Sequence, residues 1–179
     1  VIRDIPSVNV VEGNKRTSLR QDIQKELKSR GQTCQCVRCR EVRGQSVQVD
    51  RLVLEDLAYQ AGGCEEHFLS FNTPGDRLAG FLRLSLPGAQ ALNTGMSDLD
   101  GAAIIREVHV YGQSLPVGTG EQGAAQHAGL GTRLLQHAAE IAQRAGFARL
   151  AVISAVGTRR YYLERGFERG YLYLVRDLA

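Results

Sequence analysis

The sequence predicts an α/β fold with one main core, in which a mixed central sheet is flanked by helices and preceded by a basic helix and a cysteine-rich linker. Several short segments rich in β-branched or aromatic residues are separated by turn residues, which is typical of strands. A glycine-rich segment and an amphipathic helix connect two of them, which indicates a βαβ-like unit. The chain has 179 residues, 43% of them hydrophobic, and this length suffices for one sizeable domain.

The first expected element is a basic amphipathic helix over residues 17–30. Its apolar residues recur every four positions: Leu19, Ile23 and Leu27. Ser18 and Gln21 resemble a capping box at its start, and Gly31 is suited to end it. A strand over 47–54 and a short helical stretch over 55–61 are expected next.

The sheet is expected from residue 67 onward. Its predicted strands are 67–72, 78–86, 104–111, 148–154 and 171–176. Between the third and fourth of these, residues 130–145 predict a helix that Gly146 ends. The apolar face of this helix comprises Leu134, Leu135, Ala138, Ile141, Ala142 and Ala145. A short helix over 159–165, capped by Thr158, should precede the last strand, and 112–125 should form a mobile loop entering the site.

Charge is concentrated at the front of the chain. Residues 1–50 hold ten Lys and Arg against six Asp and Glu, whereas the whole chain has a net charge of only +3. A basic segment suits an anionic partner such as RNA, although a solvated helix face is an equal alternative. The sequence contains neither an apolar run of membrane-spanning length nor a signal peptide, so we expect a cytoplasmic protein without membrane contact. Because the chain begins at Val1 within an apolar segment, we expect it to be a fragment.

Three cysteines, Cys34, Cys36 and Cys39, lie within six residues. In a reducing compartment this spacing favours a metal over disulfides, and three thiolates suit zinc. A fourth ligand could be Cys64, His67 or a group outside the chain. Three reduced cysteines without metal remain the alternative.

The glycine-rich segment 126–131 stands directly before the predicted helix 130–145. Successive backbone N–H groups there, together with the helix dipole, suit a pyrophosphate, although a plain tight turn is the alternative. Farther along, Tyr161 and Tyr162 could donate a proton to a thiolate leaving group, or could be ordinary core or surface aromatics. Glu107, His109 and His127 are possible bases, but polar residues on strands more often serve packing.

These motifs resemble the GNAT acetyltransferase superfamily, whose members bind the pyrophosphate of acetyl-CoA at a Gln-x-x-Gly-x-Gly segment. More specific strings, in 106–112, 126–131 and 151–162, resemble the Elongator catalytic subunit, and residues 2–6 resemble the tail of its radical-SAM domain. The resemblance implies that 1–46 is the end of the radical-SAM domain with a linker and a structural zinc, and that 47–179 is the GNAT domain. It implies splayed strands at 104–111 and 148–154 that hold acetyl-CoA, while the iron–sulfur cluster and S-adenosylmethionine belong to the missing domain.

The implied sites fall into three sets. The acetyl-CoA set comprises Glu107, Val108, His109, Val110, Gln126, His127, Ala128, Gly129, Leu130, Gly131, Thr132 and Ser154, with Tyr161 or Tyr162 as the catalytic residue. The zinc set is the cysteine trio. The RNA set comprises Lys15, Arg16, Arg20, Lys25, Lys28, Arg38, Arg40 and Arg43.

By this resemblance the chain acts on the wobble uridine of tRNA, positioning and hydrolysing acetyl-CoA for modification of carbon 5. Its partners would be tRNA, acetyl-CoA, its own radical-SAM domain, and other Elongator subunits or a second copy. Two other functions remain open: a general lysine or amine acetyltransferase, and a non-enzymatic zinc- and RNA-binding module.

Overall fold

A computed structural model describes residues 8, 11–13, 18–43, 47–111 and 122–178, with only the backbone of 122–128. The chain forms two compact units, Val1–Arg40 and Glu41–Ala179. The division falls between Arg40 and Glu41, earlier than the boundary predicted after residue 46. Glu41 forms a bridge with Leu78, and Val42, which is buried, donates its N–H to the Leu78 carbonyl.

The first unit contains helix α1 (Leu19–Ser29) and the short helix α2 (Val37–Arg40). Helix α1 confirms the predicted amphipathic helix, and Gly31, whose φ is +66°, lies just beyond its C-terminal cap. The Gly31 N–H donates to the Lys28 carbonyl, and the Gln32 N–H donates to the Leu27 carbonyl. This is the glycine-dependent helix ending that the sequence predicts. The predicted capping box is wrong, because the Ser18 side chain makes no capping bond.

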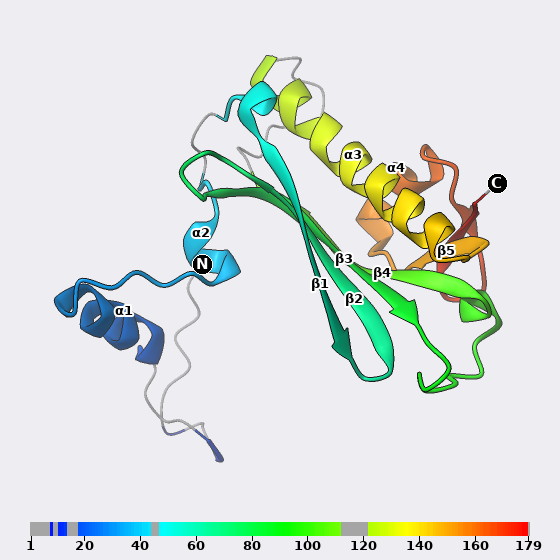
Figure 1. Cartoon of the computed structure of the whole chain (residues 1–179), viewed down its shortest axis with the longest axis horizontal. Coiled ribbons are helices and arrows are strands. Elements are labelled where there is room, and N and C mark those ends of the chain that lie inside the picture. The colour runs from blue at the N-terminus through cyan, green and yellow to red at the C-terminus, as the bar shows by residue number, and fades with distance from the viewer. Residues whose placement is uncertain (1–7, 9–10, 14–17, 44–46, 112–121, 179) are drawn as a thin grey trace. The chain divides into compact units, whose positions relative to one another are not determined.

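The second unit is built on a seven-stranded sheet of order β1-β2-β3-β4-β5-β7-β6 (Figure 1). The strands are β1 (Val53–Ala61), β2 (Cys64–Asn72), β3 (Leu78–Pro87), β4 (Ala102–Val110), β5 (Arg149–Val152), β6 (Glu168–Arg169) and β7 (Leu174–Asp177). All neighbours are antiparallel except β4 and β5, which run parallel. The predicted mixed sheet is confirmed.

The segment predicted to be helical over 55–61 is wrong, because it belongs to β1. All nine residues of β1 pair with β2, and Gly62 and Gly63 join the two strands with φ values of +60° and +80°. Two consecutive residues with positive φ form the turn that matches the twist of a two-residue hairpin. The glycines therefore reverse a strand rather than end a helix. Of the strand expected over 47–54, only Val53 and Leu54 are extended, as the start of β1, and Val49–Arg51 forms a 3-10 helix instead.

Helix α3 (Gln122–Arg144) lies along one face of the sheet (Figure 1). Its buried residues are Leu130, Leu134, Leu135, Ala138, Ala139, Ile141 and Ala142, as the sequence predicts for most of them. They pack on apolar side chains of β2 to β5, and burying each large one contributes about 1.5–3 kcal/mol. Gly146 ends the helix with a φ of +87°, and Ala145 is exposed because it lies at this turn.

A short helix, α4 (Arg159–Leu163), follows β5 and confirms the helix predicted there. Thr158 does not cap it, since its hydroxyl donates to the Ala155 carbonyl instead. Among the helices that the structure describes, none is long and apolar enough to span a membrane.

Candidate functional site

Strand β5 pairs with β4 along all four of its residues, and β4 continues beyond the end of β5. They pair only from Ala102 to Ile105 on β4, although β4 continues to Val110 alongside β3. The register of β3 and β4 shifts next to Arg106, which places a β-bulge where the pairing with β5 ends. Bulges bend the strand that carries them. Residues 106–110 of β4 therefore have no β5 partner, and we call this unpaired region, which lies where the resemblance implies a splay, the splay.

The two faces of this β4 segment differ. Val108 and Val110 pack against the core that α3 covers, whereas Glu107 and His109 alternate to the opposite face. On that face the His109 Nε2 lies 2.8 Å from a Glu107 carboxylate oxygen, and the His109 ring stacks on Phe81 with centroids 5.1 Å apart. Side chains of Glu107 and His109 thus interact with each other and with the sheet.

The glycine-rich segment 126–131 is not a loop, because α3 begins at Gln122 and includes it. The helix starts earlier than its apolar pattern predicts. Side chains of Gln126, His127 and Ala128 lie outside the described residues. Gly129 is exposed, and Leu130 and Gly131 are buried.

Tyr161 contacts this part of α3 directly. A Cβ on Gly131 would collide with the Tyr161 hydroxyl, so the glycine permits this close approach. The same added Cβ would lie 3.6 Å from a Val110 methyl. The Tyr161 hydroxyl is therefore held between α3 and the free part of β4.

Arg165 supports this tyrosine. Its guanidinium carbon lies 3.7 Å from the centre of the Tyr161 ring, and its Nε donates to the Thr132 hydroxyl at 2.9 Å. Burial raises the pKa of the Tyr161 phenol, an effect that the Arg165 charge and hydrogen bonds with Thr132 and Arg165 only partly offset. The phenol is accordingly protonated at neutral pH and able to donate. Sequence reasoning missed Arg165, although it follows the paired tyrosines by only a few residues.

Tyr162 occupies a different environment. It is buried in the core, with its ring edge-on to Phe167 at 5.5 Å. Burial, and to a smaller extent the neighbouring Tyr161, raises the pKa of its phenol. Ser154, which follows β5, is half-buried at the other side of the splay.

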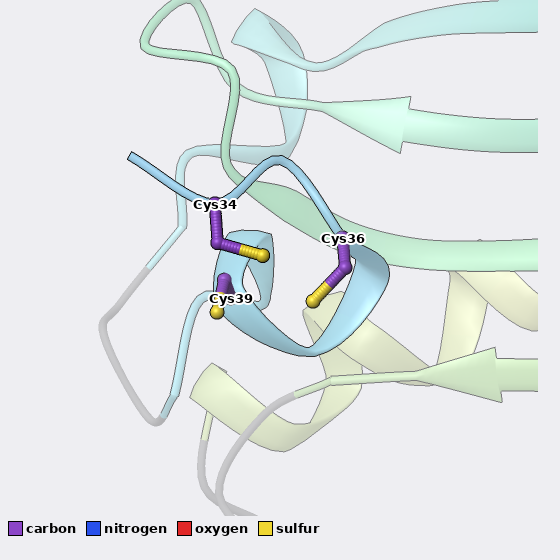
Figure 2. Close-up of side chains that lie close together, drawn as sticks. All are labelled: Cys34, Cys36 and Cys39. Carbon is purple, nitrogen blue, oxygen red and sulfur yellow. The ribbon is translucent and has the colours of Figure 1, made fainter. Parts of the chain in front are cut away.

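The three clustered cysteines of the first unit converge in space (Figure 2). The Sγ atoms of Cys34, Cys36 and Cys39 all lie within 4.8 Å of one another. Hydrogen bonds from the Cys39 backbone, the Cys34 side chain and Arg20 lower the pKa of Cys36 to about 6. A thiolate is the form that binds metal, so this trio could hold one soft ion.

Two arginines of the predicted RNA set, Arg20 and Arg43, interact with side chains of this protein. The Arg20 guanidinium lies 3.1 Å from the Cys39 Sγ, and Arg43 pairs with Glu41 at 3.3 Å. Lys25, Lys28 and Arg38 are exposed, whereas Arg40 is half-buried. Lys15 and Arg16 lie outside the described residues.

A pocket of about 470 Å³ lies on the sheet face opposite α3, next to the β4 bulge. Glu66, Ser85 and Arg106 form its polar wall, and the sequence alone did not single out any of them as a site residue. They come from three strands, and no local pattern connects them.

No protein-family model matches the chain. Curated relatives do: the tRNA uridine(34) acetyltransferase of Dehalococcoides mccartyi is 40% identical over 99% of this chain and 39% of its own length. Elongator complex protein 3 of Danio rerio is 38% identical over 99% of the chain and 33% of its own length. The chain thus spans less than half the length of these relatives.

A solved structure is also similar: archaeal Elp3 from Methanocaldococcus infernus, with an N-terminal deletion. It is 31% identical and superposes with a TM-score of 0.76, covering 98% of this chain and 43% of that one. The predicted α/β acetyltransferase fold is confirmed.

Proposed function

This chain belongs to the family that contains Elongator complex protein 3 and the tRNA uridine(34) acetyltransferases, and from this premise we propose that it is the acetyl-CoA-binding part of a tRNA-modifying acyltransferase. The observation that carries the proposal is the splay of β4 from β5 with the Tyr161 hydroxyl at its edge. The substrate in the relatives' name, uridine 34 of tRNA, is proposed for this chain as well.

Acetyl-CoA would lie along the free part of β4. The backbone of Glu107 to Val110 faces the splay, where no β5 partner occupies its hydrogen-bonding groups in the described sheet. An extended pantetheine arm has amide groups that can pair with such an edge, much as an added strand does. The pyrophosphate would lie near the first turns of α3, where the helix dipole favours negative charge. Ser154 would border the arm from the β5 side.

Tyr161 would act on the thioester. A protonated phenol can hydrogen-bond the thioester oxygen or protonate the CoA sulfur as it leaves. The raised pKa keeps that proton available, and Arg165 fixes the ring. Tyr162 lies in the core beside Phe167, so Tyr161 is the tyrosine we assign to the chemistry.

Carbon 5 chemistry on uridine would come from the radical-SAM part of the enzyme, with its iron–sulfur cluster and S-adenosylmethionine. In our proposal the present chain delivers the acetyl group and assists thioester hydrolysis. The exposed Lys25, Lys28 and Arg38 would contribute to binding the tRNA backbone.

The first unit would hold a structural zinc ion. Three Sγ atoms within 4.8 Å of one another fit the ligand type and spacing of a tetrahedral zinc site. Cys34, Cys36 and Cys39 would be three of its four ligands.

Release of CoA from acetyl-CoA, followed by chromatography with and without tRNA, tests the proposal. Wild-type chain should release CoA, and tRNA should accelerate it. Tyr161→Phe should lower the rate by about 10²-fold or more, the usual effect of removing a general acid. Tyr162→Phe, the matched control, should keep the wild-type rate.

Three outcomes would contradict the proposal in different ways. Equal rates in wild type and Tyr161→Phe would remove Tyr161 from the chemistry. Rapid transfer of acetyl to lysine or a small amine without RNA would favour a general amine acetyltransferase. Binding of tRNA without any binding of acetyl-CoA would favour a zinc- and RNA-binding module.

A further inference from the structure

Helix α1 lacks the usual supports of a short helix. It has 11 residues, none of them buried, and no side-chain cap at its start. Isolated helices of about this length are only marginally stable in water, and most helices in proteins depend on the packing of an apolar face. Contacts other than burial among the described residues therefore have to hold α1 in place.

The side chains of Arg20 and Gln24 connect α1 to the clustered cysteines. The Arg20 guanidinium lies 3.1 Å from the Cys39 Sγ and 3.7 Å from the Cys36 Sγ. The Gln24 amide nitrogen lies 3.4 Å from the same Cys39 Sγ. Among the described residues, every side-chain hydrogen bond from α1 and its cap residues to another part of the chain ends on one of these two sulfurs. Because Arg20 and Gln24 are four positions apart and share one face of the helix, α1 contacts the cysteines through that face.

The strength of these hydrogen bonds depends on the charge of the sulfur. A thiol sulfur is a weak acceptor, whereas a cysteine that coordinates a metal is a thiolate. Hydrogen bonds to an ionised acceptor are roughly twice as strong as those between neutral groups. Both sulfurs lie where water competes for the donors, since Cys36 is exposed and Cys39 is half-buried. Thiolates held by a metal would therefore anchor α1 much better than free thiols.

Charge balance at the three cysteines favours the same arrangement. Three thiolates around a divalent zinc ion leave one surplus negative charge, and the Arg20 guanidinium supplies one positive charge beside them. Groups that donate hydrogen bonds to metal ligands fix the orientation of those ligands and raise metal affinity. Arg20 and Gln24 thus stand in the position of such groups, and the contact benefits the metal site as well as the helix.

We propose that Arg20 and Gln24 position the metal-binding cysteines through hydrogen bonds to the sulfurs of Cys36 and Cys39, and that the bound metal in turn fixes helix α1. This inference rests on the zinc site proposed above, and neither residue is a ligand of it. Arg20, which the sequence pattern assigns to the RNA set, belongs instead to the metal site. Lys25 directly follows Gln24 and lies about 100° farther around the helix, so a fixed α1 directs this lysine away from the cysteines.

Zinc affinity of the full 179-residue chain, measured by competition with a chromophoric chelator, tests the positioning role. Arg20→Met and Gln24→Leu should each weaken zinc binding by about 10- to 100-fold, the usual effect of removing a partner of a metal ligand. Arg30→Met is the matched control for charge, because Arg30 pairs with Glu26 at 2.7 Å. Gln21→Leu is the matched control for the amide, because the Gln21 side chain bonds no cysteine among the described residues. Both controls should bind zinc as tightly as wild type.

Amide hydrogen exchange of residues 19–29, measured by mass spectrometry, tests whether the metal fixes α1. Removal of zinc from wild type should bring the exchange of these amides close to the rate of an unfolded peptide, because an unsupported helix of this length is marginal. Exchange in β5, Arg149–Val152, should not change, since this strand belongs to the other compact unit. In Arg20→Met the α1 amides should exchange fast even at saturating zinc, whereas Arg30→Met should stay close to wild type.

Wild-type zinc affinity in both Arg20→Met and Gln24→Leu, an equal loss of affinity in Arg30→Met, or α1 exchange that is the same with and without zinc would overturn the inference. Gln24→Leu, at an exposed position, decides the question if Arg20→Met fails to fold. If the wild-type chain retains no zinc, the proposed zinc site fails and the inference falls with it. Acetyl-CoA and tRNA binding, measured on the same samples, test the rest of the proposed function separately.

Discussion

Replacing Gly131 with alanine should test how closely α3 approaches Tyr161. The added Cβ would collide with the Tyr161 hydroxyl, and overpacking of this kind costs about 1–3 kcal/mol. Alanine also favours a helix interior over glycine by about 1 kcal/mol. The two effects together predict a net loss of up to about 2 kcal/mol in the free energy of unfolding.

The effect of Gly131→Ala on the free energy of unfolding should change sign when the Tyr161 hydroxyl is removed. In a Tyr161→Phe background the nearest atoms to the new Cβ would be the ring carbon Cζ at 3.4 Å and a Val110 methyl at 3.6 Å, which is ordinary contact. Gly131→Ala should then stabilise the chain by about 1 kcal/mol through helix propensity alone. The double-mutant cycle should yield a coupling energy of about 1–3 kcal/mol.

Urea unfolding followed by circular dichroism measures the free energy of unfolding of wild type, the two single variants and the double variant. Gly129→Ala is the matched control, since a Cβ there meets nothing within 4 Å. It should stabilise both backgrounds by about 1 kcal/mol. If Gly131→Ala has the same effect with and without the Tyr161 hydroxyl, the two groups do not approach each other and the site geometry argued above is wrong.

Three further predictions concern charge and metal. The Asp98 carboxylate accepts hydrogen bonds from the backbone N–H groups of residues 171–173, which lowers its pKa. The stabilisation by this carboxylate should therefore be present at neutral pH and lost as pH falls through its folded-state pKa. The melting temperature of Asp98→Asn should accordingly decline less on acidification than that of wild type. Cys39→Ser should abolish zinc retention measured by mass spectrometry of the metal, whereas Cys64→Ser should retain about one ion per chain; an unchanged zinc content in Cys39→Ser would refute the cysteine site. Changing Lys25 and Lys28 together to alanine should weaken tRNA binding and make its dependence on log salt shallower by about 1 to 2 units, and an unchanged slope would mean that neither lysine contacts phosphate.

Periodic segments of the second unit were predictable from the sequence. The apolar face of α3 and its glycine stop were correct because both are local signals, a 3.6-residue period and a positive φ at Gly146. The segment 55–61 was not, because its acidic residues are weak strand formers and only pairing with β2 makes it a strand. Strand β6, of two residues, is too short to leave a pattern.

The site was predictable only where its residues are contiguous. The paired tyrosines and the three cysteines are sequence motifs, and the structure brings the thiols together. That Tyr161 faces α3 while Tyr162 enters the core depends on Gly131 and Phe167, residues of other elements. Glu66 and Arg106 are separated by 40 positions and meet through strand register, which a single sequence does not reveal.

The two edge strands of the sheet, β1 and β6, differ in how much unpaired edge they offer to another chain. Strand β6, at one end, offers only two residues, whereas β1, at the other, offers nine, with Val53, Leu57 and Tyr59 exposed. A long edge with exposed apolar side chains is a template on which a further strand can add, and acidic side chains such as Glu55 oppose that addition. Self-association of this chain should accordingly begin at β1.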